Sequence, residues 1–217
     1  MIKAAIFDLD GTLLNTLEDV VNACNYALKK CNFKTHSIEE YKVFVGDGRS
    51  KLIERIVPDE YKGNDEVKNK VLRLFDEYYS GHMLDMTKPY EGICEMLKSL
   101  KEKGVKLAVV SNKPDEFVGG IVKKYFGDTF EIVHGQRTNY PVKPDPTTVY
   151  EVIEYFGIKL NESIYVGDSN VDIYTAKNAK VKSIGVAWGF RGEEELREAG
   201  ADYIVYDSNE ITELILS

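Results

Sequence analysis

The sequence of 217 residues predicts an α/β fold. From residue 87 onward, short apolar runs typical of strands alternate with amphipathic stretches typical of helices. Strands joined by helices of this length form crossover connections, which indicate a parallel sheet. A block that is helical throughout, residues 15–86, interrupts the alternation after the first strand. We therefore expect an α/β core made of residues 1–14 and 87–217, into which a small helical domain, residues 15–86, is inserted.

Each predicted strand is a short run of apolar and β-branched residues bounded by turn-forming residues. These runs cover residues 4–7, 105–110, 130–133, 163–166, 182–186 and 203–205. The first predicted helix follows Asn15 or Thr16 as its N-cap, has Asp19 in its first turn and carries apolar residues at helical spacing up to Cys31. The other predicted helices cover residues 38–45, 50–57, 65–79, 93–103, 117–126 and 146–156. The last helix is clearly framed, because Asp145 stands as its N-cap, Pro146 at its first position and Gly157 beyond its end.

Composition and charge restrict the class of protein. A formal net charge of −8 argues against nucleic acid or an anionic membrane as the main partner. Cys24, Cys31 and Cys94 show no C-x-x-C spacing, so neither a disulfide framework nor a zinc site is indicated. No stretch is apolar enough to span a membrane, and only four apolar residues in a row precede Asp8, which is too few for a signal peptide. We expect a cytoplasmic protein, monomer or homodimer, whose partner is a small molecule.

Two aspartates, Asp8 and Asp10, leave the end of the first predicted strand together. Carboxylates packed side by side repel each other and resist ionising together, so a cation must compensate them. Oxygen ligands of this kind suit a hard divalent metal ion.

Further polar residues follow the other predicted strands. Ser111 and Asn112 follow the second strand, Asp168 and Asp172 follow a later one, and Lys143 lies just before the framed helix. Taken singly, the serine reads as a turn residue, the lysine as a surface charge and Asp172 as an acid in the first turn of a helix. In doubly wound sheets, however, ligands bind outside the carboxyl ends of the strands, where these groups would converge. Together they favour a site for a phosphate monoester held against a divalent cation.

The four groups of residues resemble the motifs of the haloacid dehalogenase superfamily of phosphohydrolases. The first motif is Asp8-Leu9-Asp10-Gly11-Thr12, the second Ser111-Asn112, the third Lys143-Pro144 and the fourth Gly167-Asp168-Ser169-Asn170-Val171-Asp172. The resemblance implies a Rossmann-like parallel sheet with an inserted, all-helical cap domain of the C1 type, a lid over the active site. It also implies a magnesium-dependent phosphatase.

The resemblance assigns roles to the acidic residues. The residue matching Asp8 is the nucleophile and forms a phospho-aspartyl intermediate, while the residue matching Asp10 protonates the leaving alkoxide and then activates water. Mg²⁺ would be held by Asp8, the backbone carbonyl of Asp10 and Asp168, with Asp172 supporting these ligands.

The phosphoryl oxygens would be bound by a second set of groups. Ser111 and Lys143 would contact them directly, together with backbone amides near Gly11, Thr12 and Asn112. Lys143 and the metal would supply the positive charge that the loose, highly charged transition state of phosphoryl transfer requires.

The helical block contains one candidate for reading the substrate. This candidate is the turn Val45-Gly46-Asp47-Gly48-Arg49. Val45-Gly46-Asp47-Gly48 followed by Leu52, Glu54 and Arg55 resembles the corresponding stretch of phosphoglycolate phosphatases, as does Gly185-Val186-Ala187-Trp188-Gly189 in the core. Arg49 would hold a substrate anion. The alternative is an ordinary turn between helices with a solvated arginine.

Other functions share part of this pattern. A sugar-phosphate mutase of the β-phosphoglucomutase type has the same four motifs, but those mutases carry a histidine in the first cap helix and residues 16–28 contain none. A pyrophosphatase or nucleotidase would use the same chemistry. A receiver-like phospho-acceptor protein also combines acidic residues, a hydroxyl and a lysine, but receivers lack a large helical insertion after the first strand.

Overall fold

The computed structural model describes residues 1–217, and the chain divides into two compact units. One unit consists of Met1–Asn15 and Pro89–Ser217, and the other of Thr16–Lys88. The first contains the main sheet, and its strands alternate with helices along the chain, so the predicted α/β class is confirmed. The boundaries between the units fall at two short strands, β2 (Leu14–Asn15) and β3 (Lys88–Pro89). These two strands form a separate two-stranded sheet.

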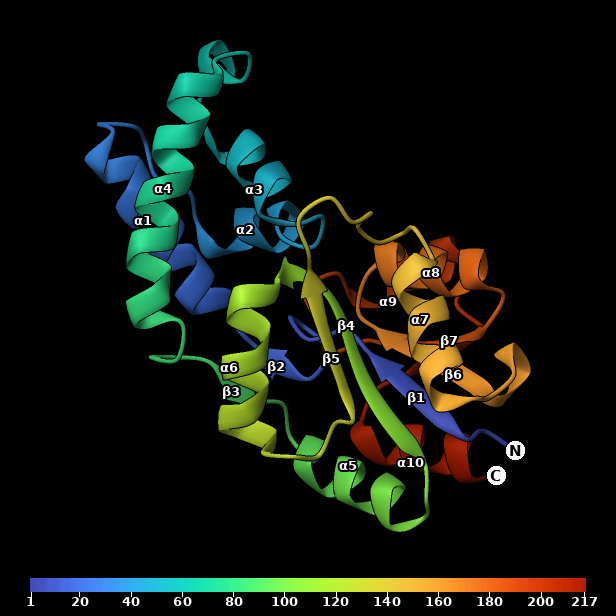
Figure 1. Ribbon diagram of the computed structural model, residues 1–217. Coiled ribbons are helices and arrows are strands. Elements are labelled where there is room, and N and C mark those ends of the chain that lie inside the picture. The colour runs from blue at the N-terminus through green and yellow to red at the C-terminus, as the bar shows by residue number, and fades with distance from the viewer. The chain divides into compact units, whose positions relative to one another are not determined.

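The core is a six-stranded sheet in the order β5-β4-β1-β6-β7-β8 (Figure 1). Every neighbouring pair runs parallel. The strands are β1 (Ala4–Phe7), β4 (Lys106–Pro114), β5 (Ile132–Gln136), β6 (Ser163–Gly167), β7 (Lys182–Val186) and β8 (Tyr203–Val205). Since β1 lies between β4 and β6, the carboxyl ends of these three strands meet at one edge of the sheet.

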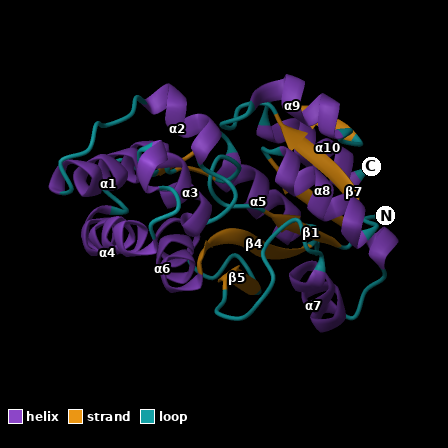
Figure 2. Ribbon diagram, turned by 90° about the horizontal axis from the view of Figure 1, so that it is seen from above, coloured by secondary structure: helices purple, strands orange, loops and turns teal.

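Helices cover both faces of this sheet. They are α5 (Ile93–Glu102), α6 (Asp115–Phe126), α7 (Thr147–Phe156), α8 (Asn170–Ala179), α9 (Gly192–Ala199) and α10 (Ser208–Leu216), with a short 3₁₀ turn, η2 (Leu160–Glu162). On one face, Ile6 and Tyr165 pack against Val152 of α7 and Ala176 of α8. Figure 2 shows α7 on one side of β1 and β4 and α5 on the other. Residues of β1 that point to either face are fully buried, as expected when both faces are covered.

Several predicted boundaries in the core are wrong. β5 covers Ile132–Gln136 instead of residues 130–133, and α6 begins at Asp115 instead of residue 117. Strand β4 does not end at Val110 but continues to Pro114, with a shift of its register against β5. The helix expected to begin at Pro146 begins at Thr147, and Pro146 is its N-cap. Asp145 nevertheless binds the first turn, because its carboxylate accepts hydrogen bonds from the backbone N–H and the hydroxyl of Thr147 at 2.9 and 2.5 Å.

The second unit is entirely helical apart from its last residue in β3. It consists of α1 (Leu17–Lys30), α2 (Ile38–Phe44), α3 (Arg49–Ile56), η1 (Asp59–Tyr61) and α4 (Asp65–His82). Helices α1 and α4 pack along each other, and Tyr26 stacks on Tyr78 with ring centroids 4.5 Å apart. Helix α4 runs past the predicted end at residue 79, since His82 stacks on Tyr78 and its ring lies 2.8 Å from Asp85.

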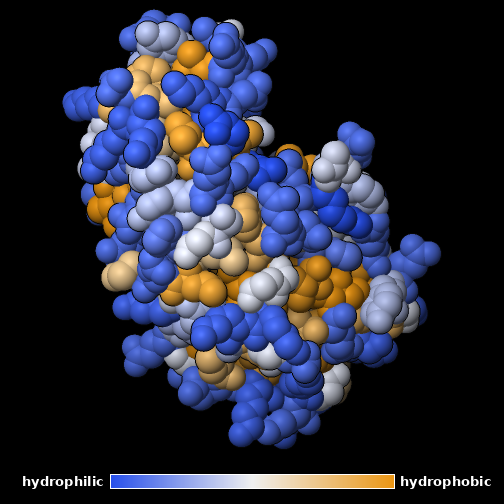
Figure 3. All heavy atoms as spheres, turned by 60° about the vertical axis from the view of Figure 1, so that its left-hand side comes forward, coloured by the Kyte–Doolittle hydropathy of each residue, from blue (hydrophilic) through white to orange (hydrophobic).

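The surface agrees with the charged composition of the chain. On the face shown in Figure 3, hydrophilic side chains predominate and apolar groups lie between them. None of the helices has both the length and the apolar character that a membrane span requires.

Candidate active site

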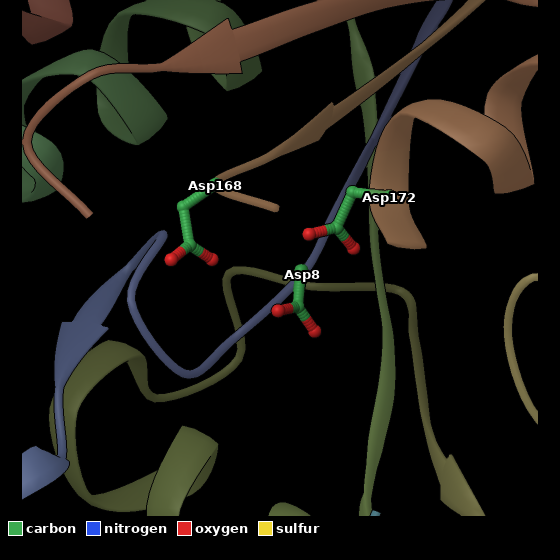
Figure 4. A group of neighbouring side chains, drawn as sticks. All are labelled: Asp8, Asp168 and Asp172. Carbon is green, nitrogen blue, oxygen red and sulfur yellow. The ribbon is translucent and has the colours of Figure 1, made fainter. Parts of the chain in front are cut away.

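Three buried carboxylates meet at the carboxyl edge of the core sheet. Asp8 follows β1, Asp168 follows β6 and Asp172 lies in the first turn of α8 (Figure 4). Each offers an oxygen within 4.8 Å of those of the other two. They converge because parallel neighbouring strands end at the same edge, as the sequence suggested.

Lys143 lies within this cluster rather than on the surface. Its ammonium is 2.8 Å from Asp8 Oδ1 and 2.7 Å from Asp172 Oδ1, and only 4% of its side chain is exposed. The face of Tyr165 lies 5.6 Å from the same ammonium and provides a cation–π contact. The surface-charge alternative for this lysine is therefore wrong.

Asn112 fixes the backbone that carries this lysine. Its side-chain oxygen accepts from the N–H of Lys143 at 2.8 Å, and its amide donates to the Lys143 carbonyl at 3.1 Å. The peptide bond between Lys143 and Pro144 is cis. Asn112 thus couples the end of β4 to the segment that delivers the ammonium.

The charges of the cluster are not balanced by its lysine. Burial raises the pKa of Asp8 to about 6, opposed by Lys143 and assisted by Asp172. Burial, together with the charges of Asp172 and Asp8, raises the pKa of Asp168 well above its ordinary value. Burial opposes the charge on Lys143, yet Asp172 and Asp8 raise its pKa well above that of a free lysine. Three carboxylates around one ammonium leave an excess of negative charge.

This donor set fits a hard divalent cation. Asp8 Oδ1 is buried, and Lys143 Nζ lies 2.8 Å from it. Asp168 is held in place by Thr12 Oγ1 at 3.2 Å on one oxygen and by the N–H of Phe190 at 2.8 Å on the other. Asp8 and Asp168 therefore offer oriented oxygen ligands, and a dication would supply the missing positive charge.

Asp172 accepts more hydrogen bonds than the other two carboxylates. Its Oδ2 accepts from the N–H of Ser169 at 3.1 Å and from the Ser169 hydroxyl at 2.7 Å, while its Oδ1 meets Lys143. These contacts form a capping box at the start of α8 and give Asp172 a structural role beside the site.

Three glycines allow the carboxylates to approach the backbone closely. A Cβ at Gly11 or Gly189 would lie 2.3 or 2.1 Å from atoms of Asp168, and one at Gly167 would lie 2.2 Å from Asp172. Gly11 also has a backbone φ of +84°, which residues with a side chain rarely adopt.

A Gly189→Ala substitution tests this packing. The added methyl group would overlap Asp168 Cβ, so we expect a loss of about 1–3 kcal/mol in the free energy of unfolding, measured with urea. Gly119→Ala is the matched control, because its Cβ meets nothing within 4 Å inside α6, and we expect it to stabilise by about 0.5–1 kcal/mol. Equal stability of the Gly189 variant and the wild type would contradict the close approach.

A second buried lysine, absent from the residues proposed from sequence, meets Asp10. Lys113 Nζ lies 3.0 and 3.2 Å from the two carboxylate oxygens of Asp10. Beside it, Ser111 Oγ accepts from the backbone N–H of Lys113 at 3.2 Å. The signal that could have revealed this lysine is strand periodicity, since a strand continued past residue 110 places Ser111 and Lys113 on the same face.

The remaining candidates lie in two places. Thr12 belongs to the core site, where its carbonyl also accepts from the indole N–H of Trp188 at 3.1 Å. Arg49 lies in the helical unit, and its guanidinium donates to both oxygens of Asp76 at 2.9 Å. This arginine is 28% exposed and is not simply solvated, as the alternative interpretation held. Its contact with substrate stays a prediction.

Comparison with known proteins identifies the family. The sequence profile of the haloacid dehalogenase-like hydrolases matches residues 5–186. A phosphoglycolate phosphatase of Vibrio parahaemolyticus is 32% identical over 225 residues, covering 99% of this chain and 96% of its own length. One from Pseudomonas fluorescens is 31% identical over 209 residues, covering 94% of this chain and 76% of its own length.

A solved structure agrees with these matches. The crystal structure of a protein from Lactobacillus delbrueckii subsp. bulgaricus, assigned as a phosphoglycolate phosphatase, superposes with a TM-score of 0.92 at 35% identity and covers 98% of both chains. The receiver-like alternative is left without support, since the protein is a phosphoric monoester hydrolase. The chain belongs to the haloacid dehalogenase-like hydrolase family.

Proposed function

We propose that this enzyme hydrolyses a small-molecule phosphate monoester through a phospho-aspartyl intermediate on Asp8, with Mg²⁺ as its cofactor. The observation that carries the proposal is the position of Asp8, a buried carboxylate in contact with Lys143 and grouped with Asp168. A carboxylate beside a fixed ammonium and a metal site is able to meet a phosphate dianion that it would otherwise repel.

The reaction proceeds in two displacements at phosphorus. In the first, an Asp8 oxygen forms a bond to phosphorus while the ester P–O bond breaks, and Asp10 gives its proton to the departing alkoxide. In the second, Asp10 takes a proton from water, the water oxygen bonds to phosphorus, and the bond to Asp8 breaks to release inorganic phosphate. One group serves as acid and then as base. Lys143, Ser111 and the amides near Gly11, Thr12 and Asn112 stabilise the phosphoryl oxygens.

Mg²⁺ would be held by Asp8, the backbone carbonyl of Asp10 and Asp168. When bound, it supplies positive charge that offsets the repulsion between the phosphoryl group and the carboxylates. Asp172 supports the site through Lys143 and Ser169 rather than as a ligand.

The substrate is a small phosphorylated metabolite, with phosphoglycolate as the first candidate because the similar proteins from Vibrio and Pseudomonas bear that activity in their names. We also propose that the helical unit acts as a lid that excludes water and completes the substrate site. Arg49 would have to exchange its ion pair with Asp76 to bind a substrate anion.

Turnover of p-nitrophenyl phosphate with and without Mg²⁺ tests the phosphatase activity. Ranking phosphoglycolate, hexose phosphates, nucleotides and pyrophosphate by kcat/KM tests the substrate. Absence of turnover of every compound in the presence of Mg²⁺ would contradict the proposed function, whereas preference for a nucleotide or pyrophosphate would change only the substrate.

Metal binding should also be visible in the stability of the protein. The pKa of Asp8 rises from 3.8 to about 6 on folding, so the folded protein without metal holds a proton that the unfolded chain releases between these values. Stability is therefore present at acid pH and lost as pH rises through this window, by about 3 kcal/mol for a shift of this size. We expect the melting temperature of the metal-free protein to fall between about pH 4 and 6.

Mg²⁺ should reverse this loss at neutral pH. A ligand at about 100 times its Kd stabilises the folded state by about 2.7 kcal/mol, which is several degrees in melting temperature. The control is Asp168→Asn, which should abolish the shift caused by Mg²⁺. An unchanged melting temperature of the wild type with millimolar Mg²⁺ would contradict the metal site.

A further inference from the structure

Lys113 is a buried charged residue that the proposed reaction does not use. It lies near the carboxyl end of β4, in the stretch that continues beyond Val110. Its side chain is 5% exposed and that of its partner Asp10 is 15% exposed. Burying an ammonium is costly unless it is paired, and the partner of this ammonium is Asp10.

The contact with Asp10 fixes the carboxylate in space. Nζ reaches both oxygens, at 3.0 and 3.2 Å, so the plane and the direction of the carboxyl group are restrained together. The pair is largely shielded from water, which strengthens its attraction compared with that of a surface ion pair.

The backbone that carries Lys113 is held in place by contacts within the site. The backbone N–H of Lys113 donates to Ser111 Oγ, and the preceding Asn112 is bound on both sides of its amide to the backbone of Lys143. Three consecutive residues of one strand thus serve three groups of the site. Ser111 is the proposed phosphate ligand, Asn112 holds the segment of Lys143, and Lys113 holds Asp10.

We propose that Lys113 is a positioning residue, which orients the carboxyl group of Asp10 for proton transfer to the leaving group and from water. The inference rests on the proposed function, in which Asp10 is the acid and base. Fixing a catalytic carboxyl group lowers the entropy that must be lost on reaching the transition state. General acid catalysis contributes about 10²–10⁴-fold to rate, so misplacement of Asp10 should cost part of this factor.

The experiment compares two substrates of different leaving group. The leaving group of p-nitrophenyl phosphate departs without a proton, whereas an alkoxide needs one. We expect Lys113→Met to lower kcat/KM for the best alkyl phosphate of the substrate panel by about 10²-fold, and for p-nitrophenyl phosphate by less than about tenfold. Lys113→Arg, which retains the charge and a donor pair, should recover most of the loss.

Two controls separate positioning from folding. Lys106→Met removes a lysine from the other end of β4, where Nζ donates to the Phe156 carbonyl, and should leave the ratio of the two kcat/KM values unchanged. In an Asp10→Asn background, Lys113→Met should change that ratio no further, because the group that it positions is gone. The melting temperature and its Mg²⁺ shift show whether each variant folds.

An equal loss for both substrates, or a further change of the ratio in the Asp10→Asn background, would overturn the role of Lys113. Failure of the wild type to hydrolyse either substrate would instead overturn the proposed function, so the two outcomes are distinct.

Discussion

Replacing Asp8 with asparagine is expected to abolish phosphatase turnover, lowering kcat for p-nitrophenyl phosphate by about 10⁴-fold or more. An amide is of nearly the same size as a carboxylate but is not nucleophilic, so no bond to phosphorus forms. The substitution also removes one of the three buried carboxylates of the cluster and one of the two that contact Lys143. Because burial raises the pKa of Asp8, its charged form destabilises the metal-free protein at neutral pH. The variant should therefore be at least as stable as the wild type without metal.

The pairing of lost activity with retained stability distinguishes a nucleophile from a structural carboxylate. The matched control is Asp128→Asn, which removes an exposed carboxylate paired with Lys123 at 2.5 Å and should change neither kcat nor the melting temperature by much. A rate near that of the wild type for Asp8→Asn would show that the nucleophile is another residue.

The strands that sequence predicts best are those whose apolar pattern ends where the strand ends. β1, β7 and β8 have the predicted bounds, and in β1 the charged Asp8 follows the apolar run directly. β4 is different, since its apolar run stops at Val110 while the strand continues to Pro114. Its polar residues can stay buried because each has a partner in the site, which hydrophobic periodicity does not record.

The candidate site was predictable in part for a similar reason. The rule that ligands bind at the carboxyl ends of parallel strands places Asp8 and Asp168 together, and the order of the sheet agrees with it. The partner of Lys113 could not be predicted, because it depends on β4 lying next to β1. The side-chain clamp of Asn112 on the backbone of Lys143 depends on a loop path that no local pattern encodes.

Replacing Lys143 with methionine is expected to lower both activity and stability, each by a large amount. The substitution leaves Asp8 and Asp172 buried without the ammonium 2.8 and 2.7 Å away. Breaking a buried ion pair from one side typically costs about 3–5 kcal/mol, which unfolding in urea at neutral pH without metal would measure. Loss of a cation from the transition state of phosphoryl transfer should lower kcat/KM by about 10³-fold.

The dependence of this destabilisation on pH follows from the sign of the pKa shifts. The raised pKa of Lys143 means that its stabilising charge is present across the whole range below that of a free lysine, so the wild type retains it at neutral and acid pH. In the variant, Asp8 lacks the ammonium that holds down its already raised pKa, so it takes up a proton on mild acidification. The difference in unfolding free energy between wild type and variant should therefore shrink as pH falls below about 5.

A second substitution separates the electrostatic cause from loss of packing. Asp172→Asn in the Lys143→Met background removes the carboxylate that meets the lysine at 2.7 Å and keeps the size of the side chain. If repulsion between carboxylates causes the instability, the double variant is more stable than Lys143→Met at neutral pH, while its activity stays low because no ammonium faces the phosphate. A single variant as stable as the wild type at neutral pH would mean that Asp8 and Asp172 are not both charged in the folded protein. In that case Lys143 would neutralise the one charged carboxylate of this pair in the wild type. The excess negative charge that favours a metal ion would then come from Asp168 alone.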